Sequence, residues 1–252
     1  MGGLGILRPG AVALVTGASA GIGAATAAAL AREGGRVICA ARDMDRLEAL
    51  AAEIGEGAHA LRLDVADGAS VAGAIERLPA DLREIDILIA CAGSDLGGRQ
   101  RFDAGDMEEW AATIETNVTG TIRMCHAVIP GMLARGRGHV VTLGSVAGLR
   151  PQPSGAVYSA SKFAVRALTE ALRADYADTD LRVTEILPGL TRTEFAKRRH
   201  HGDAARGEAF YDRFPQSLTA DDIARAIVYA LAQPTHVTIA QMVVVPTRGA
   251  RA

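Results

Sequence analysis

Several features that would specify a class of protein are scarce or missing in this 252-residue sequence. It has only three cysteines, Cys39, Cys91 and Cys125, scattered and odd in number, which argues against a disulfide-stapled extracellular domain. No apolar run is long enough to span a bilayer, and the N-terminal MGGLGILRPG lacks the charged start and apolar core of a signal peptide. We therefore expect a soluble protein of the cytoplasm.

Signals for nucleic acid, membrane or metal binding are also missing. The formal net charge of -2 gives no reason to expect nucleic acid or an anionic membrane as a partner. The six histidines follow no metal-ligand spacing, and the side chains of the adjacent His200 and His201 should diverge. Lysine is scarce as well, because only Lys162 and Lys197 occur among 27 basic residues. A lysine in this chain therefore calls for a specific explanation.

Short apolar runs alternate with longer alanine-rich stretches along the whole chain. This alternation predicts right-handed crossovers, hence one Rossmann-like α/β domain over residues 1–252, with a seven-stranded doubly wound parallel sheet and helices on both faces. The predicted strands are Val12–Thr16, Arg36–Ala41, His59–Asp64, Ile85–Cys91, His139–Gly144, Arg182–Leu187 and Val237–Val245, and the predicted helices are about 22–33, 43–54, 67–80, 105–134, 156–177 and 219–232. The irregular, basic segment at about 190–215 is predicted to be a substrate lid.

A glycine-rich turn follows the first predicted strand and opens the first predicted helix. It reads TGASAGIG over residues 16–23. Glycines allow the backbone to turn sharply and to approach a pyrophosphate, whose charge a helix N-terminus stabilises. Glycine-rich turns are common, so the position of this one after the first strand is what favours dinucleotide binding.

The end of the second predicted strand bears on the choice of cofactor. An NAD site places an acidic residue there for the ribose 2′-hydroxyl, and an NADP site places a basic one for the 2′-phosphate. This chain has Ala41 followed by Arg42, about 18 residues after Gly23, and a guanidinium suits a phosphate. The sequence predicts NADP(H). A solvated Arg42 that only caps the strand is the alternative, and Asp43 would partly offset its field.

A tyrosine and a lysine share one face of the fifth predicted helix. Tyr158 and Lys162 are four residues apart, which stacks their side chains on one helical face. A tyrosine of ordinary pKa ~10 becomes a useful acid–base group when a nearby cation favours its phenolate. Ser145, thirteen residues upstream, ends a buried strand, and ligands bind at the carboxyl ends of such strands. The three residues predict a proton-transfer site.

Together the motifs resemble a known family. TGASAGIG, Asn117 in TNVTG, Ser145 in LGSVAG, YSASK and LPGLTRT occur in the order and spacing of short-chain dehydrogenases/reductases, and the resemblance covers almost the whole chain. Stretches such as ICAARDMDRLEAL and LRVTEILPGLTRTEF further resemble bacterial NADP-dependent 3-hydroxy acid dehydrogenases, the branch that includes serine and allo-threonine dehydrogenases.

The resemblance implies a catalytic tetrad of Asn117, Ser145, Tyr158 and Lys162. Ser145 would hydrogen-bond the substrate oxygen, and Tyr158 would give or take its proton. Lys162 would lower the tyrosine pKa and hold the nicotinamide ribose, and Asn117 would anchor a water in a proton relay. By the same resemblance, the long helices at about 111–134 and 156–177 would pair between subunits of a homotetramer, with a dimer as the second expectation.

The resemblance also implies a set of cofactor contacts. They are Gly17, Ser19, Ala20, Gly21, Ile22, Gly23, Arg42, Asp64, Val65, Ala92, Gly93, Tyr158, Lys162, Pro188, Gly189, Thr191 and Thr193. One departure stands out: the usual Asn-Asn-Ala-Gly after the fourth strand reads Ala-Cys-Ala-Gly at residues 90–93. We expect this change to alter local packing and to leave activity intact.

The substrate is less well specified. The 190–215 segment holds six basic residues (Arg192, Lys197, Arg198, Arg199, Arg206, Arg213) against four acidic ones (Glu194, Asp203, Glu208, Asp212). With Arg150 they would clamp an anionic substrate such as a 3-hydroxy acid, although a solvated polar loop is the alternative. A broad carbonyl reductase, a β-ketoacyl reductase and a non-catalytic NADP-sensing scaffold on the same fold are the competing functions.

Overall fold

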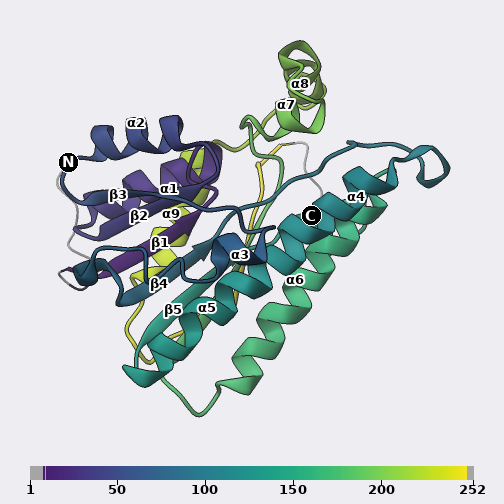
Figure 1. Ribbon diagram of the computed structural model, residues 1–252. Helices are drawn as coiled ribbons and strands as arrows, with labels where there is room; N and C mark the ends of the chain where they lie inside the picture. The colour runs from purple at the N-terminus through teal and green to yellow at the C-terminus, as the bar shows by residue number, and fades with distance from the viewer. Residues whose placement is uncertain (1–7, 9, 249–252) are drawn as a thin grey trace.

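Seven parallel strands form the centre of the protein. The computed structural model describes residue 8 and residues 10–248. The strands lie side by side in the order β3-β2-β1-β4-β5-β6-β7 (Figure 1). They are β1 (Val12–Thr16), β2 (Arg36–Ala41), β3 (Ala58–Arg62), β4 (Ile85–Ala90), β5 (Gly138–Leu143), β6 (Leu181–Pro188) and β7 (Gln241–Val244). The order reverses between β1 and β4, which creates a crevice at the carboxyl ends of these two strands.

Helices cover both faces of this sheet, as the predicted doubly wound architecture requires. One face carries α1 (Gly21–Arg32), α2 (Met44–Ile54) and α9 (Ala220–Leu231), whose Leu30, Leu47 and Ile227 share one apolar core. The other face carries α3 (Gly68–Val71), α4 (Met107–Ile114), α5 (Gly120–Ala134) and α6 (Ala156–Asp175), with Met124 and Met132 in a second core. The central strand β1 is buried along its whole length, so the apolar run Val12–Val15 that precedes Thr16 fits its place between the two cores.

The helix predicted over residues 105–134 is interrupted near its middle. A π-helical turn, η3 (Glu115–Thr119), joins α4 to α5 without a break in the chain direction. Such turns insert one residue into the α-helical pattern and are frequent at functional sites. Asn117 lies in this turn and is buried.

Three predicted boundaries were wrong or imprecise. The helix predicted at 67–80 is limited to α3, because Gly73 adopts a positive φ of 70° and hydrogen-bonded turns follow. The last strand is shorter than the predicted Val237–Val245. The 190–215 segment, expected to be irregular, contains two short helices, α7 (Phe195–Arg199) and α8 (Ala204–Tyr211), which stand at one end of the molecule in Figure 1.

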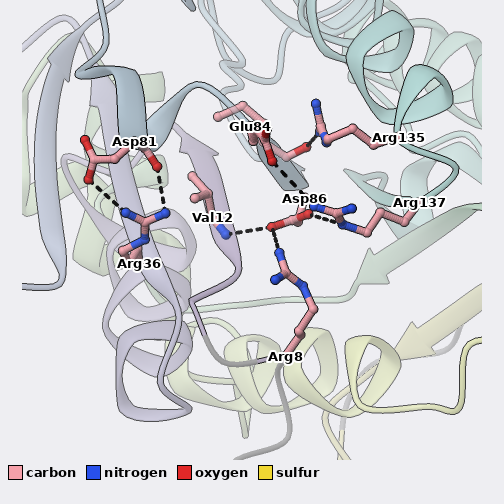
Figure 2. A network of polar contacts seen from close by, with 9 residues as sticks. Arg8, Val12, Arg36, Asp81, Glu84, Asp86, Arg135 and Arg137 are labelled. Carbon is pink, nitrogen blue, oxygen red and sulfur yellow. Dashed lines mark hydrogen bonds and ion pairs between the residues drawn. The ribbon is translucent and has the colours of Figure 1, made fainter.

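A network of ion pairs fills the amino ends of the strands (Figure 2). Asp86 in β4 is buried and accepts hydrogen bonds from the Val12 backbone N–H at 3.1 Å, Arg8 at 2.7 Å and Arg137 at 3.0 Å. Arg36 contacts both the side chain and the backbone carbonyl of Asp81. The carboxylates of Asp81 and Asp86 are therefore paired with arginines within the protein.

Three findings bear on the expectations drawn from composition. Across residues 8 and 10–248, no helix is long and apolar enough to cross a membrane. Cys39, Cys91 and Cys125 are all free thiols, and burial raises the pKa of each one, most clearly for Cys91 and Cys125, to about 12. In the same part of the chain no cluster of potential metal ligands occurs.

Candidate active site

The glycine-rich turn forms a cradle at the crevice between β1 and β4. Gly17 has a positive φ of 69°, and a Cβ there would stand 2.9 Å from the backbone of Ala92. A Cβ on Gly23 would come within 2.4 Å of the Gly17 carbonyl oxygen. Thr16 fastens the opposite wall, since its hydroxyl accepts hydrogen bonds from the N–H groups of Cys91 and Ala92. At positions 17 and 23 only glycine fits, because a Cβ would collide with the backbone.

The N-terminus of α1 opens into this cradle. Its N-cap residue, Ala20, has extended backbone and supplies no side-chain cap, and the first turn contains no acidic residue. The first N–H groups of the twelve-residue helix are thus left for another acceptor. An exposed helix N-terminus beside a glycine cradle fits a pyrophosphate. The residues present therefore suit a dinucleotide.

Ser145, Tyr158 and Lys162 come together at the carboxyl end of β5. Ser145 follows this strand and begins the 3₁₀ turn η4 (Val146–Gly148), and its hydroxyl accepts from the Ala147 N–H at 3.1 Å. Tyr158 and Lys162 project from the first turns of α6. The Lys162 ammonium donates to the Leu143 carbonyl at 2.8 Å and lies 5.7 Å from the centre of the Tyr158 ring. The serine, phenol and ammonium groups line one cleft.

The pKa values of the tyrosine and lysine are shifted from their ordinary values. Burial raises the pKa of Tyr158 to about 12, while hydrogen bonding to Ser145 opposes that rise. Burial lowers the pKa of Lys162 to about 8, and the nearby acidic groups of Cys91, Glu185 and Asp95 oppose that fall. At neutral pH the phenol therefore carries its proton and the lysine its charge. The site is prepared to donate a proton.

Asn117 lies behind the cleft and is held by a loop. Its Oδ1 accepts from the Ser94 N–H at 2.7 Å, and its Nδ2 donates to the Ser94 carbonyl and to the Ser161 hydroxyl. A Cβ on Gly93 would lie 3.3 Å from the Asn117 Oδ1 and 3.8 Å from the Lys162 Nζ. The asparagine is therefore close to the lysine, while its side chain is occupied in fixing the loop after β4.

The cleft collects most of the residues that the sequence predicts as contacts. It encloses about 350 Å³. Thirteen predicted residues line it: Gly17, Ala20, Gly21, Ile22, Gly23, Gly93, Ser145, Tyr158, Lys162, Pro188, Gly189, Thr191 and Thr193. Six lie outside its wall: Ser19, Arg42, Asp64, Val65, Ala92 and Asn117. Val65 is buried against Gly120, whereas Arg42 is exposed at the end of β2.

The surroundings of Arg42 bear on cofactor choice. Asp43, which was expected to offset the Arg42 charge, caps α2 by accepting from the Arg46 N–H at 3.2 Å and also pairs with the Arg46 side chain. Arg46 in turn forms an ion pair with Glu194 at 2.7 Å. The Asp43 carboxylate is thus engaged by its own helix. In the described part of the chain, Arg42 has no ion-pair partner of its own.

A cluster of aromatic and basic side chains closes the far wall of the cleft. Six residues of this wall were not predicted from the sequence: Arg99, Phe195, Phe210, Tyr211, Phe214 and Gln216. A usable signal was present, because aromatic residues are only 4% of the chain and four of them fall between residues 195 and 214. Tyr211 anchors the segment, since its hydroxyl bonds to backbone groups of Thr191 and Thr193.

Arg199 is the buried charge of this wall. Its Nε lies 2.7 Å from Asp95, both side chains are 7% exposed, and its guanidinium stacks over the Phe210 ring at 4.8 Å. The Nη1 atom of Arg199 is buried without a hydrogen-bond partner among the described residues. Arg99 lies over the same ring at 5.6 Å. Two guanidinium groups and one carboxylate thus meet beside Tyr158.

The remaining basic residues of the predicted clamp have different surroundings. Arg192 is paired with Glu208 and Asp212 on the surface. Arg198 lines the cleft and pairs with Glu194 at 3.7 Å. Arg150 is exposed and is not part of the cleft wall, although it was expected to approach it.

Comparisons with known proteins agree on one family. Residues 11–204 match the family model described as short chain dehydrogenase. The NADP-dependent 3-hydroxy acid dehydrogenase YdfG of Salmonella typhi is 39% identical over 236 residues, which are 93% of this chain and 94% of that protein. The glycine betaine reductase ATRR of Emericella nidulans is 41% identical over 246 residues, but the chain spans only 19% of its length. A closed form of serine dehydrogenase complexed with NADP+ matches with a TM-score of 0.92 and 36% identity, covering 96% of this chain and 97% of that one.

Proposed function

The chain belongs to the short-chain dehydrogenase family, and on that premise we propose an NADP(H)-dependent oxidoreductase that interconverts a small 3-hydroxy acid and its carbonyl form. One observation carries the proposal: Ser145, Tyr158 and Lys162 share a single cleft with the glycine cradle at the β1–β4 crevice. Hydride transfer to and from carbonyl carbon is the chemistry that a bound nicotinamide supplies.

The protein's own groups position the substrate and move its proton. The Ser145 hydroxyl hydrogen-bonds the substrate oxygen, and the protonated Tyr158 donates to that oxygen as negative charge develops on it. The Lys162 ammonium, 5.7 Å from the centre of the tyrosine ring, stabilises the phenolate that remains. Asn117 fixes the loop beside Lys162 and anchors the relay that returns the proton. Alcohol oxidation uses the same groups in reverse.

In this proposal, two parts of the protein bind NADP(H): the glycine cradle and the end of β2. Gly17, Gly21 and Gly23 with the α1 N-terminus receive the pyrophosphate, and Arg42 receives the 2′-phosphate. The engagement of Asp43 with Arg46 supports this assignment, because it leaves the Arg42 charge less offset than the sequence suggested. Asp64 and Val65 contact the adenine part of the cofactor, and Thr193 contacts the nicotinamide carboxamide. The NADP dependence of the relative YdfG supports the same choice.

The arginine pair beside Tyr158 supports an anionic substrate. Arg99, Arg199 and Asp95 together carry one net positive charge, which suits a single carboxylate, and the Arg199 Nη1 has a donor to offer. A carboxylate bound there would direct the neighbouring carbonyl towards Ser145 and Tyr158. The name of the relative YdfG, a 3-hydroxy acid dehydrogenase, points the same way.

The test compares matched substrates and matched variants. NADPH oxidation is measured with β-keto acids and their methyl esters at low and high salt. We expect higher kcat/KM for the acids, and a loss of about tenfold for the acids alone in Arg99→Gln. Arg150→Gln, which changes an arginine outside the cleft wall, serves as the control. A higher kcat/KM for the esters at both salt concentrations would favour a broad carbonyl reductase, and NADPH binding without any turnover would favour a non-catalytic scaffold.

We further propose a homotetramer acting in the cytoplasm. Ile114, Ile122 and Phe163 are 37%, 44% and 37% exposed on α4, α5 and α6, which lie side by side in Figure 1. Tyr229 on α9 and Val243 on β7 are further exposed apolar side chains, on elements other than α4, α5 and α6. Exposed apolar side chains on two different sets of elements fit the two interfaces of a tetramer better than the single one of a dimer. Light scattering that returns the monomer mass of 26.2 kDa at micromolar concentration refutes this assembly. The three free thiols fit a reducing compartment.

A further inference from the structure

Glu185 is a fully buried carboxyl group that the proposed reaction leaves unused. It lies in β6 with 0% exposure, paired in register with Thr142 of β5. Its Oε2 accepts from the Gln241 side chain at 2.7 Å, and its Oε1 has no hydrogen-bond partner among the described residues. Burying a carboxyl group with half of its hydrogen-bonding capacity unmet is costly, so its presence calls for a reason.

The position of this carboxyl group relates it to the catalytic lysine. A Cβ on Gly144 would stand only 2.3 Å from the Glu185 Oε1, so the carboxyl group lies directly behind the Gly144 backbone. Gly144 stands between Leu143, whose carbonyl accepts from the Lys162 ammonium at 2.8 Å, and Ser145. The Glu185 carboxyl group therefore packs against the Leu143–Gly144 backbone, whose Leu143 carbonyl binds the Lys162 ammonium.

The charged groups around Glu185 have other partners. Arg166 of α6 pairs with Glu170 at 2.9 Å, and Arg173 of α6 donates to the backbone carbonyls of Val183 and Ala240. The neutral Gln241 side chain of β7 donates a hydrogen bond to Glu185. Burial raises the pKa of Glu185, and Gln241, Arg166, Arg173 and Lys162 oppose that rise. Arg173 and Lys162 both donate only to neutral carbonyls, and of the two only Lys162 lines the cleft.

Lys162 itself is surrounded by few negative groups. Cys91 from the end of β4, Asp95 from the following loop and Glu185 from β6 are the groups whose charge opposes the effect of burial on its pKa. The Cys91 thiol is neutral at physiological pH, because burial raises its pKa to about 12. Asp95 is already paired with Arg199 at 2.7 Å. Glu185 is the carboxylate that remains for the lysine.

We propose that Glu185 is a positioning residue whose carboxylate, behind the Gly144 backbone, keeps the Lys162 ammonium protonated and bound to the Leu143 carbonyl. The catalytic consequence rests on the proposed dehydrogenase function: a protonated lysine stabilises the Tyr158 phenolate, so Glu185 sets the upper pH limit of alcohol oxidation. The lysine's own protonation is a property of the folded chain and can be measured without any substrate.

The scarcity of lysine makes a direct measurement practical. In protein labelled with [13Cε]lysine, only Lys162 and Lys197 give signals, and the exposed Lys197 is an internal reference. We expect the Lys162 pKa, about 8 in the native protein, to fall by about one pH unit in Glu185→Gln. Glu185→Asp, which keeps the charge, should restore most of the native value. Thr184→Val, a fully buried change in the same strand, should leave it unchanged.

An unchanged Lys162 titration in a folded Glu185→Gln protein overturns the proposal. So does an equal fall in Thr184→Val, which would make the effect one of general packing. If Glu185→Gln does not fold, Glu185→Asp provides the test of the proposal. Shortening the side chain moves the carboxylate, so the Lys162 pKa should fall slightly while the Lys197 pKa stays constant.

The pH profile of alcohol oxidation then tests the catalytic consequence. The alkaline limb of kcat should move to lower pH in Glu185→Gln by the same amount as the Lys162 titration, with little change in KM for NADP+. A profile that stays in place while the lysine titration shifts would overturn the link to catalysis. Absence of oxidation in the wild-type protein would instead count against the proposed function, and the lysine titration would stand by itself.

Discussion

The two ends of the parallel sheet treat their charged residues differently. At the amino ends, Asp86 receives three hydrogen bonds, and Arg36 is held by both the side chain and the carbonyl of Asp81 (Figure 2). At the carboxyl ends, Tyr158 and Lys162 are buried with shifted pKa values, and Arg199 keeps a buried donor without a partner. At the first end the carboxylates of Asp81 and Asp86 are paired with arginines, although Arg135 Nε and His139 Nδ1 have no hydrogen-bond partner among the described residues. At the second end the unmet donor and the shifted pKa values lie in the cleft.

This difference separates residues that stabilise the fold from residues that serve a ligand. A satisfied buried network stabilises the folded state, whereas unmet donors and shifted pKa values mark functional sites when they lie in a cleft. His139 in β5, whose pKa burial lowers to about 3, is not among the cleft residues. Substitutions at the amino ends should therefore change the free energy of unfolding and leave turnover alone. Substitutions at the carboxyl ends should do the reverse.

The largest effect is expected at the carboxyl ends from Tyr158→Phe. This change removes one oxygen and leaves the ring to pack against Phe195, whose ring centre is 5.8 Å away. Turnover in NADPH oxidation should fall by at least ~10²–10⁴, the usual contribution of general acid–base catalysis. NADPH binding and thermal unfolding should change little. Tyr176→Phe, at the far end of α6, is the matched control, and a Tyr158→Phe enzyme within tenfold of wild type would show that another group is the acid.

Arg42→Ala should give the next largest effect, again without loss of stability. The guanidinium is exposed, so its removal leaves no buried group unsatisfied. A charge-assisted contact to phosphate contributes roughly 1.5–3 kcal/mol, so the Kd for NADPH should rise about ten- to a hundredfold. The Kd for NADH, measured by the same fluorescence titration, should hardly move. Equal affinity of the wild type for both cofactors contradicts this, and Arg32→Ala on α1 is the control.

Asp86→Asn, at the amino ends of the strands, should lower stability and leave turnover unchanged. The change keeps the shape of the side chain but removes the charge that Arg8 and Arg137 share. Both arginines are partly exposed, which limits the loss to about 1–3 kcal/mol of unfolding free energy in a urea titration. The kcat of the folded protein should remain within about twofold of wild type. A large loss of turnover at unchanged stability would break the proposed division between the two ends.

The smallest effect is expected from Arg36→Ala. The pair with Asp81 is largely solvent-exposed, 37% and 69% for the two side chains, and exposed pairs contribute about 0.2–1 kcal/mol. The shift in the urea midpoint should be close to the limit of detection, with kinetics unchanged. A shift as large as that of Asp86→Asn would show that exposed and buried members of this network are energetically linked.

The sequence was most informative where the chemistry is local. The glycine turn, the spacing of Tyr158 and Lys162, and the buried strands predicted the sheet and the core of the cleft, because each depends on neighbours in the chain. The helix predicted at 67–80 failed because an apolar-periodic pattern did not reveal the positive φ that Gly73 adopts. Local patterns fix elements better than they fix their ends.

Contacts between distant segments were not predictable in this way. The Asp95–Arg199 pair joins the loop after β4 to the end of α7, and nothing near either residue in the sequence singles it out. The same holds for Glu185, whose role depends on its contact with Gly144, the residue that follows the neighbouring strand β5. Arg150 was assigned to the cleft from its place between Ser145 and Tyr158, and it lies exposed outside the cleft wall instead. Which arginine faces a ligand is decided by tertiary packing.

The π-helical turn at Glu115–Thr119 makes the length of this segment matter more than its composition. One residue of an α-helix corresponds to about 100° of rotation. Deleting a single residue here would restore regular α-helix and turn α4 by about that angle relative to α5, carrying the buried Trp110 towards solvent. Substitutions at the outward positions of the turn should therefore be tolerated in a mutational scan, while any one-residue insertion or deletion should not.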